Sequence, residues 1–449
     1  MTDDRLEIFS QFEHVAHWTL PDGSTPFVSG LSGFSSETVA NWYLARHYVL
    51  HVLPPLDGNG ISPGSGERVN VVVQGTSDLM LAIVRQIALV AHYPNFNEED
   101  GFYRTSITIL YDRHEVKDIY ALLERQEYLG NLPKYCSCLS RMHGSHGLGD
   151  EDERNDDSYL DIELYLVGFD HMEESEDYIR YWRSDSLILK EDEVRAALAD
   201  VKAEDIFSVD VRDARRVNMV YHVGADIDNL PPDDPDTADR YSRALHYFCY
   251  QQSPADTQAQ WDAFFRKDGR VDGQVALRNL YSNVCCADCF DARLRSVLTP
   301  ANFRRESRKD LLRWWKMKWS RRYASILSRK DGEAFDAEEV KWLLTHEYRR
   351  VLQIVKDNLL ALSRSEHVRW VTERLIMGYS PLDEGESLWD EQHFGSEKRA
   401  NRKYIKSDLD DLFHIDICSY RDLRRINPED MKYDCFLMMA MTWIVRCRE

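Results

Sequence analysis

Short apolar runs rich in β-branched residues alternate with longer helical stretches through the middle of the chain, and this alternation limits the folds open to it. Residues 69–75, 106–112, 160–168 and 217–223 are predicted to form four strands, and residues 77–92 an apolar-rich helix between the first two. Alternating strands and helices are typical of doubly wound folds with parallel sheets. The expected fold class is therefore α/β, with a doubly wound Rossmann-like sheet followed by a helical connector and a mostly helical C-terminal domain.

The length of the chain predicts more than one domain. At 449 residues it exceeds one ordinary hydrophobic core, so two or three domains are expected. A stretch rich in glycine, proline and serine ends at Gly66, and strand signals fade after Leu245. The expected divisions are an aromatic-rich segment at 1–66, a Rossmann-like domain at 67–250, a helical connector at 251–356 and a C-terminal domain at 357–449.

The composition restricts the compartment and the partners. No apolar run approaches eighteen residues and no signal peptide opens the chain, so no membrane span and a cytoplasmic location are expected. Nine cysteines, an odd number, fit a reducing compartment, and the close spacing of Cys285, Cys286 and Cys289 matches no standard zinc pattern, so no metal site is predicted.

Nucleic acid is an unexpected partner for this chain. A formal net charge of -21 predicts repulsion from phosphate backbones. Residues 300–330 are nevertheless basic and contain three tryptophans, a mixture that can bind phosphates and stack bases. We favour the alternative in which these tryptophans enter the core and the basic side chains face the acidic remainder of the chain.

The carboxyl ends of the predicted strands are the place where a doubly wound fold binds ligands, here around Gly75, Asp112, Gly168 and Gly224. The first turn keeps only one glycine of the G-x-G-x-x-G pattern, and Asp78 places negative charge where a phosphate would bind. Binding of NAD in the usual geometry is therefore unlikely. Weaker nucleotide contacts remain open, and their candidate residues are Gly75, Thr76, Ser77 and Asp112.

Two runs near the C-terminus combine aromatic, cationic and histidine side chains. In residues 365–374, helical spacing places His367, Trp370 and Arg374 on one face, while Arg369 and Glu373 are spaced to pair. Such a face can hold a planar or anionic ligand, and it is equally typical of a packed, ion-paired helix. The candidate ligand-binding residues of the two runs are His367, Trp370, Arg374, Tyr379, His414, Asp416 and Tyr420.

The motifs of these runs resemble a known family. The first run, Glu366-His367-x-Arg369-Trp370-x-x-Glu373-Arg374 with Gly378-Tyr379, is followed by His414-x-Asp416, Tyr420-x-Asp422-Leu423 and Tyr433-Asp434. This series is similar to the RyR domain of ryanodine receptors, which bacterial proteins carry singly. The resemblance implies a ligand-sensing module in nucleotide-linked stress or phage-defence systems. Because RyR units pair in the receptors, a chain with one copy would pair by forming a homodimer or higher homo-oligomer.

The middle region resembles the nucleotide-binding domain of TrkA-type potassium-uptake regulators, through the order of its strands and the acidic turn at residues 224–230. Together the two resemblances favour a soluble sensor or regulatory protein that binds a small nucleotide-derived ligand. Two alternatives stay open: a Rossmann-type enzyme that uses NAD or hydrolyses a nucleotide, and a structural oligomerisation subunit. A catalytic role is less expected than a sensor role, because the chain has no Walker P-loop, H-E-x-x-H run or G-x-S-x-G elbow.

Overall fold

A computed structural model describes most of the sheet region and the C-terminal helices. The described residues are 36–58, 60–98, 103–125, 129–138, 159–182, 184–206, 212–225, 232–234, 236–238, 240–241, 273–298, 355–381, 403–405, 412–414 and 416–446. Several expectations therefore lie outside the described residues. They concern most of the segment 1–66, the basic stretch 300–330 and the acidic turn after Ala225.

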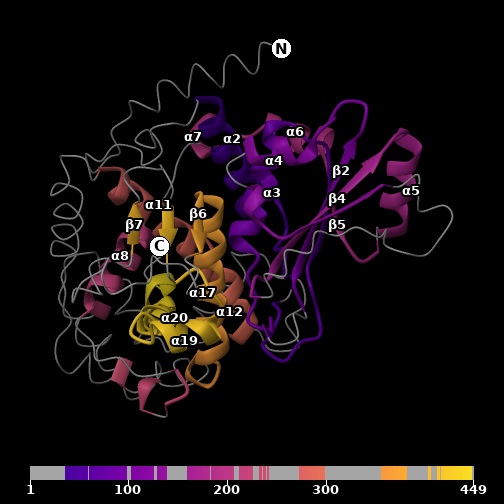
Figure 1. Ribbon diagram of the computed structural model, residues 1–449. Helices are drawn as coiled ribbons and strands as arrows, with labels where there is room; N and C mark the ends of the chain where they lie inside the picture. Colours follow the sequence, from indigo (N-terminus) through magenta and orange to yellow (C-terminus); the bar gives the residue numbers. More distant parts are fainter. Residues whose placement is uncertain are drawn as a thin grey trace, which may run out of the picture.

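A parallel five-stranded sheet forms the first half of the fold, in the order β3-β4-β2-β1-β5 (Figure 1). Its strands are β1 (Asn70–Gln74), β2 (Thr105–Asp112), β3 (Lys134–Cys138), β4 (Ile162–Phe169) and β5 (Leu187–Lys190). All four strand pairings are parallel. The predicted α/β class with a Rossmann-like sheet is thus confirmed, and three of the four predicted strands are present as β1, β2 and β4.

Helices cover both faces of the sheet. Alternate β1 residues point to opposite sides of the sheet. Val71 and Val73 pack against the helix α3 (Asp78–Val90) in one apolar core. Val72 packs on the other side, in a smaller core with Ile179 of α5 (Met172–Trp182). The helix predicted over 77–92 is confirmed, because α3 begins after Ser77, whose hydroxyl accepts from the backbone N–H of Met80. The remaining helices of this half are α2 (Ser36–His47), the π-helix η2 (Tyr48–Val52), α4 (Ile119–Arg125), the 3-10 helix η3 (Leu129–Asn131), α6 (Glu191–Ala199) and α7 (Ala203–Ile206).

The predicted fourth strand at 217–223 is wrong, because these residues lie in the helix α8 (Arg212–Ala225). Ala214, Val217 and Val220 are buried at three-residue intervals, and Gly224 continues this stripe toward the ring of Phe436. The helix packs against α11 (Gly273–Asp288) and α20 (Met431–Arg446), and this tertiary packing overrides the local β propensity. Gly224 therefore does not lie at the end of a strand.

The C-terminal half is mostly helical, as predicted, and packs on the α3 side of the sheet (Figure 1). The core that covers the sheet also contains Tyr281, Cys285 and Cys289 of α11 and its following turn, and Ile376 of a helix near the C-terminus. The other elements of this half are the helices α12 (Phe290–Leu298), α17 (Leu359–Ile376) and α19 (Tyr420–Ile426) and a small three-stranded sheet. The strands of this sheet are β6 (Tyr379–Pro381), β7 (Lys403–Ile405) and β8 (Leu412–His414), in the order β6-β8-β7. None of the described helices has the length and apolar character that a membrane span needs.

Candidate functional site

The helix α17 carries the first of the two candidate runs. It covers Leu359–Ile376, which confirms the helix predicted over 365–374, and the chain turns at Gly378 with φ of +84°. Glycine adopts this left-handed conformation without a Cβ penalty, so Gly378 ends the helix as the sequence predicts. The next residue, Tyr379, opens β6, and this turn brings its ring back toward the last turns of α17.

An aromatic and cationic cluster forms where α17 meets the small sheet. The guanidinium carbon of Arg374 lies 5.1 Å from the ring centroid of Trp370 and 5.3 Å from that of Tyr379. The ring of His414, from β8, meets Trp370 edge-on with centroids 4.8 Å apart. We call Trp370, Arg374, Tyr379 and His414 the Arg374 stack, and it joins residues from both candidate runs.

The guanidinium of Arg374 is buried with weak polar contacts. Arg374 is 6% exposed. Its Nη1 lies 4.0 Å from Met377 Sδ, and its Nε lies 4.0 Å from Glu373 Oε1. Within the described part of the chain, Nε and that carboxylate oxygen have no hydrogen-bond partner. A buried guanidinium normally makes strong, often bidentate, hydrogen bonds to an anion, so Arg374 retains the capacity to bind one.

His414 contributes a donor to the same cluster. Its Nδ1 accepts a hydrogen bond from the backbone N–H of Asp416 at 3.2 Å, so the neutral ring carries its proton on Nε2. Trp370 and Tyr379 are half-buried, whereas His414 is 3% exposed. The Arg374 stack therefore combines two aromatic faces, a cation and an imidazole N–H.

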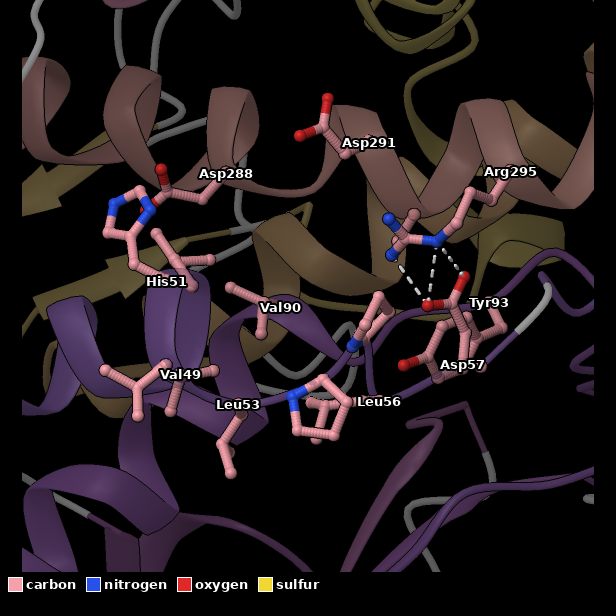
Figure 2. Close-up of a pocket in the computed structure, with 16 residues that line it drawn as sticks. Val49, His51, Leu53, Leu56, Asp57, Val90, Tyr93, Asp288, Asp291 and Arg295 are labelled. Carbon is pink, nitrogen blue, oxygen red and sulfur yellow. Dashed lines mark hydrogen bonds and ion pairs between the residues drawn. The ribbon is translucent and has the colours of Figure 1, made fainter. Parts of the chain in front are cut away.

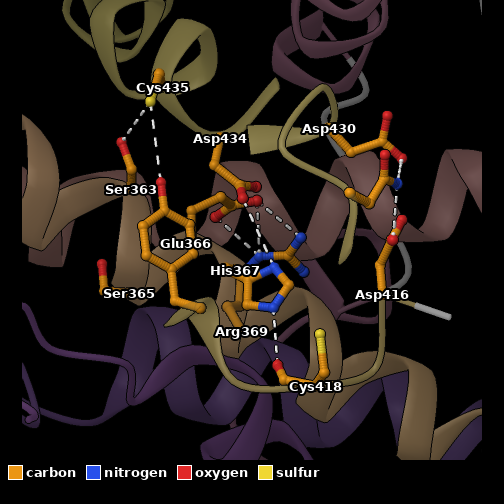
Figure 3. Close-up of polar contacts among 12 residues, drawn as sticks. Ser363, Ser365, Glu366, His367, Arg369, Asp416, Cys418, Asp430, Asp434 and Cys435 are labelled. Atoms are coloured by element: carbon orange, nitrogen blue, oxygen red, sulfur yellow. Dashed lines mark hydrogen bonds and ion pairs between the residues drawn. The ribbon is translucent and has the colours of Figure 1, made fainter. Parts of the chain in front are cut away.

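The other three candidate residues are engaged in contacts inside the fold (Figure 3). His367 Nε2 donates to the carbonyl of Cys418 at 2.9 Å, and Asp416 accepts from the side chain of Asn427 at 2.8 Å. Tyr420 is 4% exposed, with its hydroxyl 3.9 Å from Cys435 Sγ. His367 thus links the two runs, whereas Asp416 and Tyr420 contact side chains that follow the second run. By contrast, the guanidinium of Arg374 makes only weak polar contacts.

Beneath the Arg374 stack lies a buried ionic network that links α12 to α17. Arg369 pairs with Glu366 at 2.9 Å and with Glu373 at 2.5 Å, and Arg293 reaches Glu366 at 2.5 Å. All four side chains are fully buried, and Ser282 of α11 donates to Glu373. Burial alone would raise the pKa of Glu366, but the guanidinium groups of Arg369 and Arg293 lower it to about 2. The Arg369–Glu373 pair confirms the sequence expectation, whereas Arg293 was missed.

The cluster also contacts the sheet region directly. Phe96 and Leu160, which lie outside the two candidate runs, share an apolar core with Val371 and pack against Trp370 and Tyr379. The amide of Asn131 donates to the Leu375 carbonyl at 2.9 Å. The two halves of the fold thus meet at the candidate site.

The strand-end candidates lie at one edge of the sheet, since β1 and β2 pair in parallel. Asp112 accepts from the backbone N–H of His114, and Thr76 and Ser77 lie between Gly75 and α3. Gly75 has φ of +120°, and a Cβ there would lie 2.8 Å from Glu191 Oε2. A carboxylate thus covers the turn where a dinucleotide places its phosphates, which argues further against NAD.

The close cysteines on α11 and in the turn after it pack as apolar side chains. Cys285, Cys286 and Cys289 are buried, and Cys289 lies within hydrogen-bond distance of the Leu89 carbonyl. Burial raises the pKa of the Cys289 thiol to about 12, which keeps it protonated. No group of three or more His, Cys, Asp or Glu in the described ranges could hold a metal ion.

The comparisons with known proteins identify no relative. No family model matches the chain, and neither the curated proteins nor the solved structures contain a significant match.

Proposed function

We propose that the protein is a sensor that binds a small, anionic, nucleotide-like ligand at the Arg374 stack. The observation that carries this proposal is the buried guanidinium of Arg374, held between Trp370 and Tyr379 without a hydrogen-bonded carboxylate. Its charge suits a phosphate, and the aromatic rings suit a base. The resemblance of the surrounding motifs to RyR domains supports the same ligand class.

The contacts around the Arg374 stack connect the proposed ligand site to the sheet region. Trp370 and Tyr379 pack against Phe96 and Leu160, so a ligand that moves either ring changes the contact with the sheet region. We infer that binding is read out as a change in the packing of α17 against that region. Homodimerisation belongs to the same proposal, and light scattering with and without ligand tests it.

Replacing Arg374 by glutamine is expected to weaken binding of the ligand about 10- to 100-fold, because hydrogen bonds to a charged group contribute roughly 1.5–3 kcal/mol. The ligand is first sought by thermal shift among NAD, ADP-ribose, cyclic nucleotides and ATP, and its affinity is then measured by calorimetry. The unliganded variant should lose only about 1–2 kcal/mol of stability, since two cation–π contacts are removed.

Arg180→Gln is the matched control, because the side chain of Arg180 on α5 is 76% exposed. It should change neither affinity nor stability. A large loss of unliganded stability in Arg374→Gln, with ligand affinity kept, would show that Arg374 is a structural clamp. Stabilisation by a compound that is also turned over would favour the enzyme, and no response to any compound would favour a structural subunit.

A further inference from the structure

A separate cavity of about 780 Å³ lies between the end of α2, the end of α3 and the junction of α11 with α12 (Figure 2). Its volume is in the range of cavities that bind small organic molecules. None of the Arg374 stack lines this cavity, and the proposed sensor function does not use it. The lining residues are 49–58, Val90, Tyr93, Asp288, Asp291, Ala292 and Arg295.

A π-helix and the proline loop after it form the apolar wall of the cavity. The helix α2 continues directly into the π-helix η2, which ends at Leu53. Leu53 is extended, with ψ of 146°, as expected for a residue before proline. Pro54 and Pro55 carry no backbone N–H, so this loop offers few donors to a ligand. Such π-helical turns are rare and are frequent at functional sites. This wall suits an apolar body of several carbon atoms.

The charged groups of the opposite wall have partners of opposite charge inside the protein (Figure 2). Arg295 binds Asp57 through Nε and Nη2 at 3.0 and 2.6 Å, and Asp288 pairs with Arg46 at 2.6 Å. Burial alone would lower the pKa of Arg295, but Asp57 and Asp291 raise it, so Asp291 also interacts with this guanidinium. A charged ligand would therefore lose its hydration here without gaining an unpaired ion as its partner.

The hydroxyl of Tyr93 is a hydrogen-bond donor that the fold leaves unused. Tyr93 lines the cavity and is 4% exposed, and its hydroxyl makes no hydrogen bond to the described residues. Burial raises the pKa of Tyr93, so the hydroxyl keeps its proton at neutral pH and can donate. Because a buried polar group without a partner is unfavourable, an uncharged acceptor in the cavity would be stabilised by this donor.

We propose that this cavity binds an uncharged small molecule with an apolar chain and a carbonyl oxygen, such as a medium-chain ketone. The chain would pack against the Leu53–Leu56 wall, and the carbonyl oxygen would accept a hydrogen bond from the Tyr93 hydroxyl. Burial of the chain supplies most of the affinity, and the hydrogen bond fixes the polar end of the ligand. An ammonium or carboxylate group on the same chain would pay for its lost hydration without an ion pair.

The probes for calorimetry on the full chain at pH 7 are 2-octanone, octylamine and octanoate, which have equal numbers of carbon atoms and differ in charge. We expect 2-octanone to bind saturably at one site, at least about tenfold more tightly than either ion. Tyr93→Phe should weaken 2-octanone binding about three- to tenfold, because it removes the donor and keeps the ring. Val52→Trp, at a lining position that is 37% exposed, should weaken this binding by obstructing the cavity.

Tyr181→Phe and Leu360→Trp are the matched controls, because both residues lie outside the cavity and are 77% and 45% exposed. They should leave the affinity for 2-octanone unchanged, and circular dichroism melts should show that each variant is folded. The absence of saturable 2-octanone binding would overturn the proposal. So would an ion that binds as tightly as 2-octanone, or 2-octanone binding that Tyr93→Phe or Val52→Trp leaves unchanged.

Discussion

Replacing Glu366 by glutamine is expected to destabilise the folded protein by about 3–5 kcal/mol, because it leaves buried positive charge without compensation. Glu366 contacts both Arg293 and Arg369, and all three side chains are fully buried. In the variant, Arg369 would keep its ion pair with Glu373, whereas Arg293 would lose its ion pair with Glu366. Urea unfolding at pH 7, followed by circular dichroism, measures the loss as a lower midpoint.

Asp177→Asn provides the matched control for Glu366→Gln. Asp177 pairs with Arg180 on α5, where the two side chains are 57% and 76% exposed. Removing one charge of a solvated pair should change stability by no more than about 0.5 kcal/mol. If Glu366→Gln unfolded at the same urea concentration as Asp177→Asn, the network would not hold α12 to α17.

The pH range of this stabilisation follows from the pKa of Glu366. The value of about 2 is below the ordinary 4.5, so the folded state favours the ionised carboxylate. The stability that this shift contributes is complete above the unfolded value and is lost as the pH falls toward 2. At pH 7 the network is therefore intact, and a mutation measured there reports its full effect.

The network also shows what helical spacing predicts and what it leaves out. Residues three and four apart on a helix are neighbours, so the pairing of Arg369 with Glu373 could be predicted from the sequence. Arg293 belongs to another helix, and nothing in its local sequence marks it as a partner of Glu366. Spacing reveals partners within a helix, whereas partners between helices depend on how the helices pack.

The sheet likewise shows which strands local β propensity predicts and which it misses. Strands β1, β2 and β4 have β-branched or apolar runs, and these were predicted. Strand β3 is as long as β1 but contains no β-branched residue, and β5 has only four residues, too few for a periodic pattern to appear. Residues 217–223 have a strand-like composition, but they lie in α8, where the buried residues Ala214, Val217 and Val220 recur at helical spacing and the helix packs against α20 and α11. The cavity at Leu53 could not be predicted, because three separate segments form it.

His367 and Asp434 form a buried pair whose protonation is controlled by burial. His367 Nε2 donates to a carbonyl oxygen, so Nδ1 carries a lone pair, and it lies 3.6 Å from Asp434 Oδ2 (Figure 3). Only a protonated carboxyl group can donate to that lone pair. Burial lowers the pKa of His367 to about 4 and raises the pKa of Asp434 well above its usual range. Both shifts favour the uncharged forms of the folded pair, with the histidine deprotonated and the carboxyl group protonated.

This arrangement predicts how stability changes with pH. The lowered pKa of His367 makes stability rise between pH 4 and the ordinary histidine pKa of 6.5, because in this range only the unfolded histidine binds a proton. The raised pKa of Asp434 acts in the opposite direction, because above the ordinary carboxyl pKa of 3.8 the folded carboxyl group keeps a proton that the unfolded one has lost. Asp434 should therefore lower the free energy of unfolding by about 1.4 kcal/mol per pH unit from pH 3.8 until it ionises in the folded state.

Asp434→Asn isolates this effect, because an amide can donate to His367 Nδ1 but does not titrate. In the variant, only the histidine contributes, so stability should rise from pH 4 to 6.5 and the pair should add no slope above that. Every other group, including the nearby Glu366 and Arg369, titrates in both proteins. The difference between the two urea-unfolding curves across pH therefore reports Asp434 alone, and parallel curves would mean that Asp434 is ionised in the folded protein.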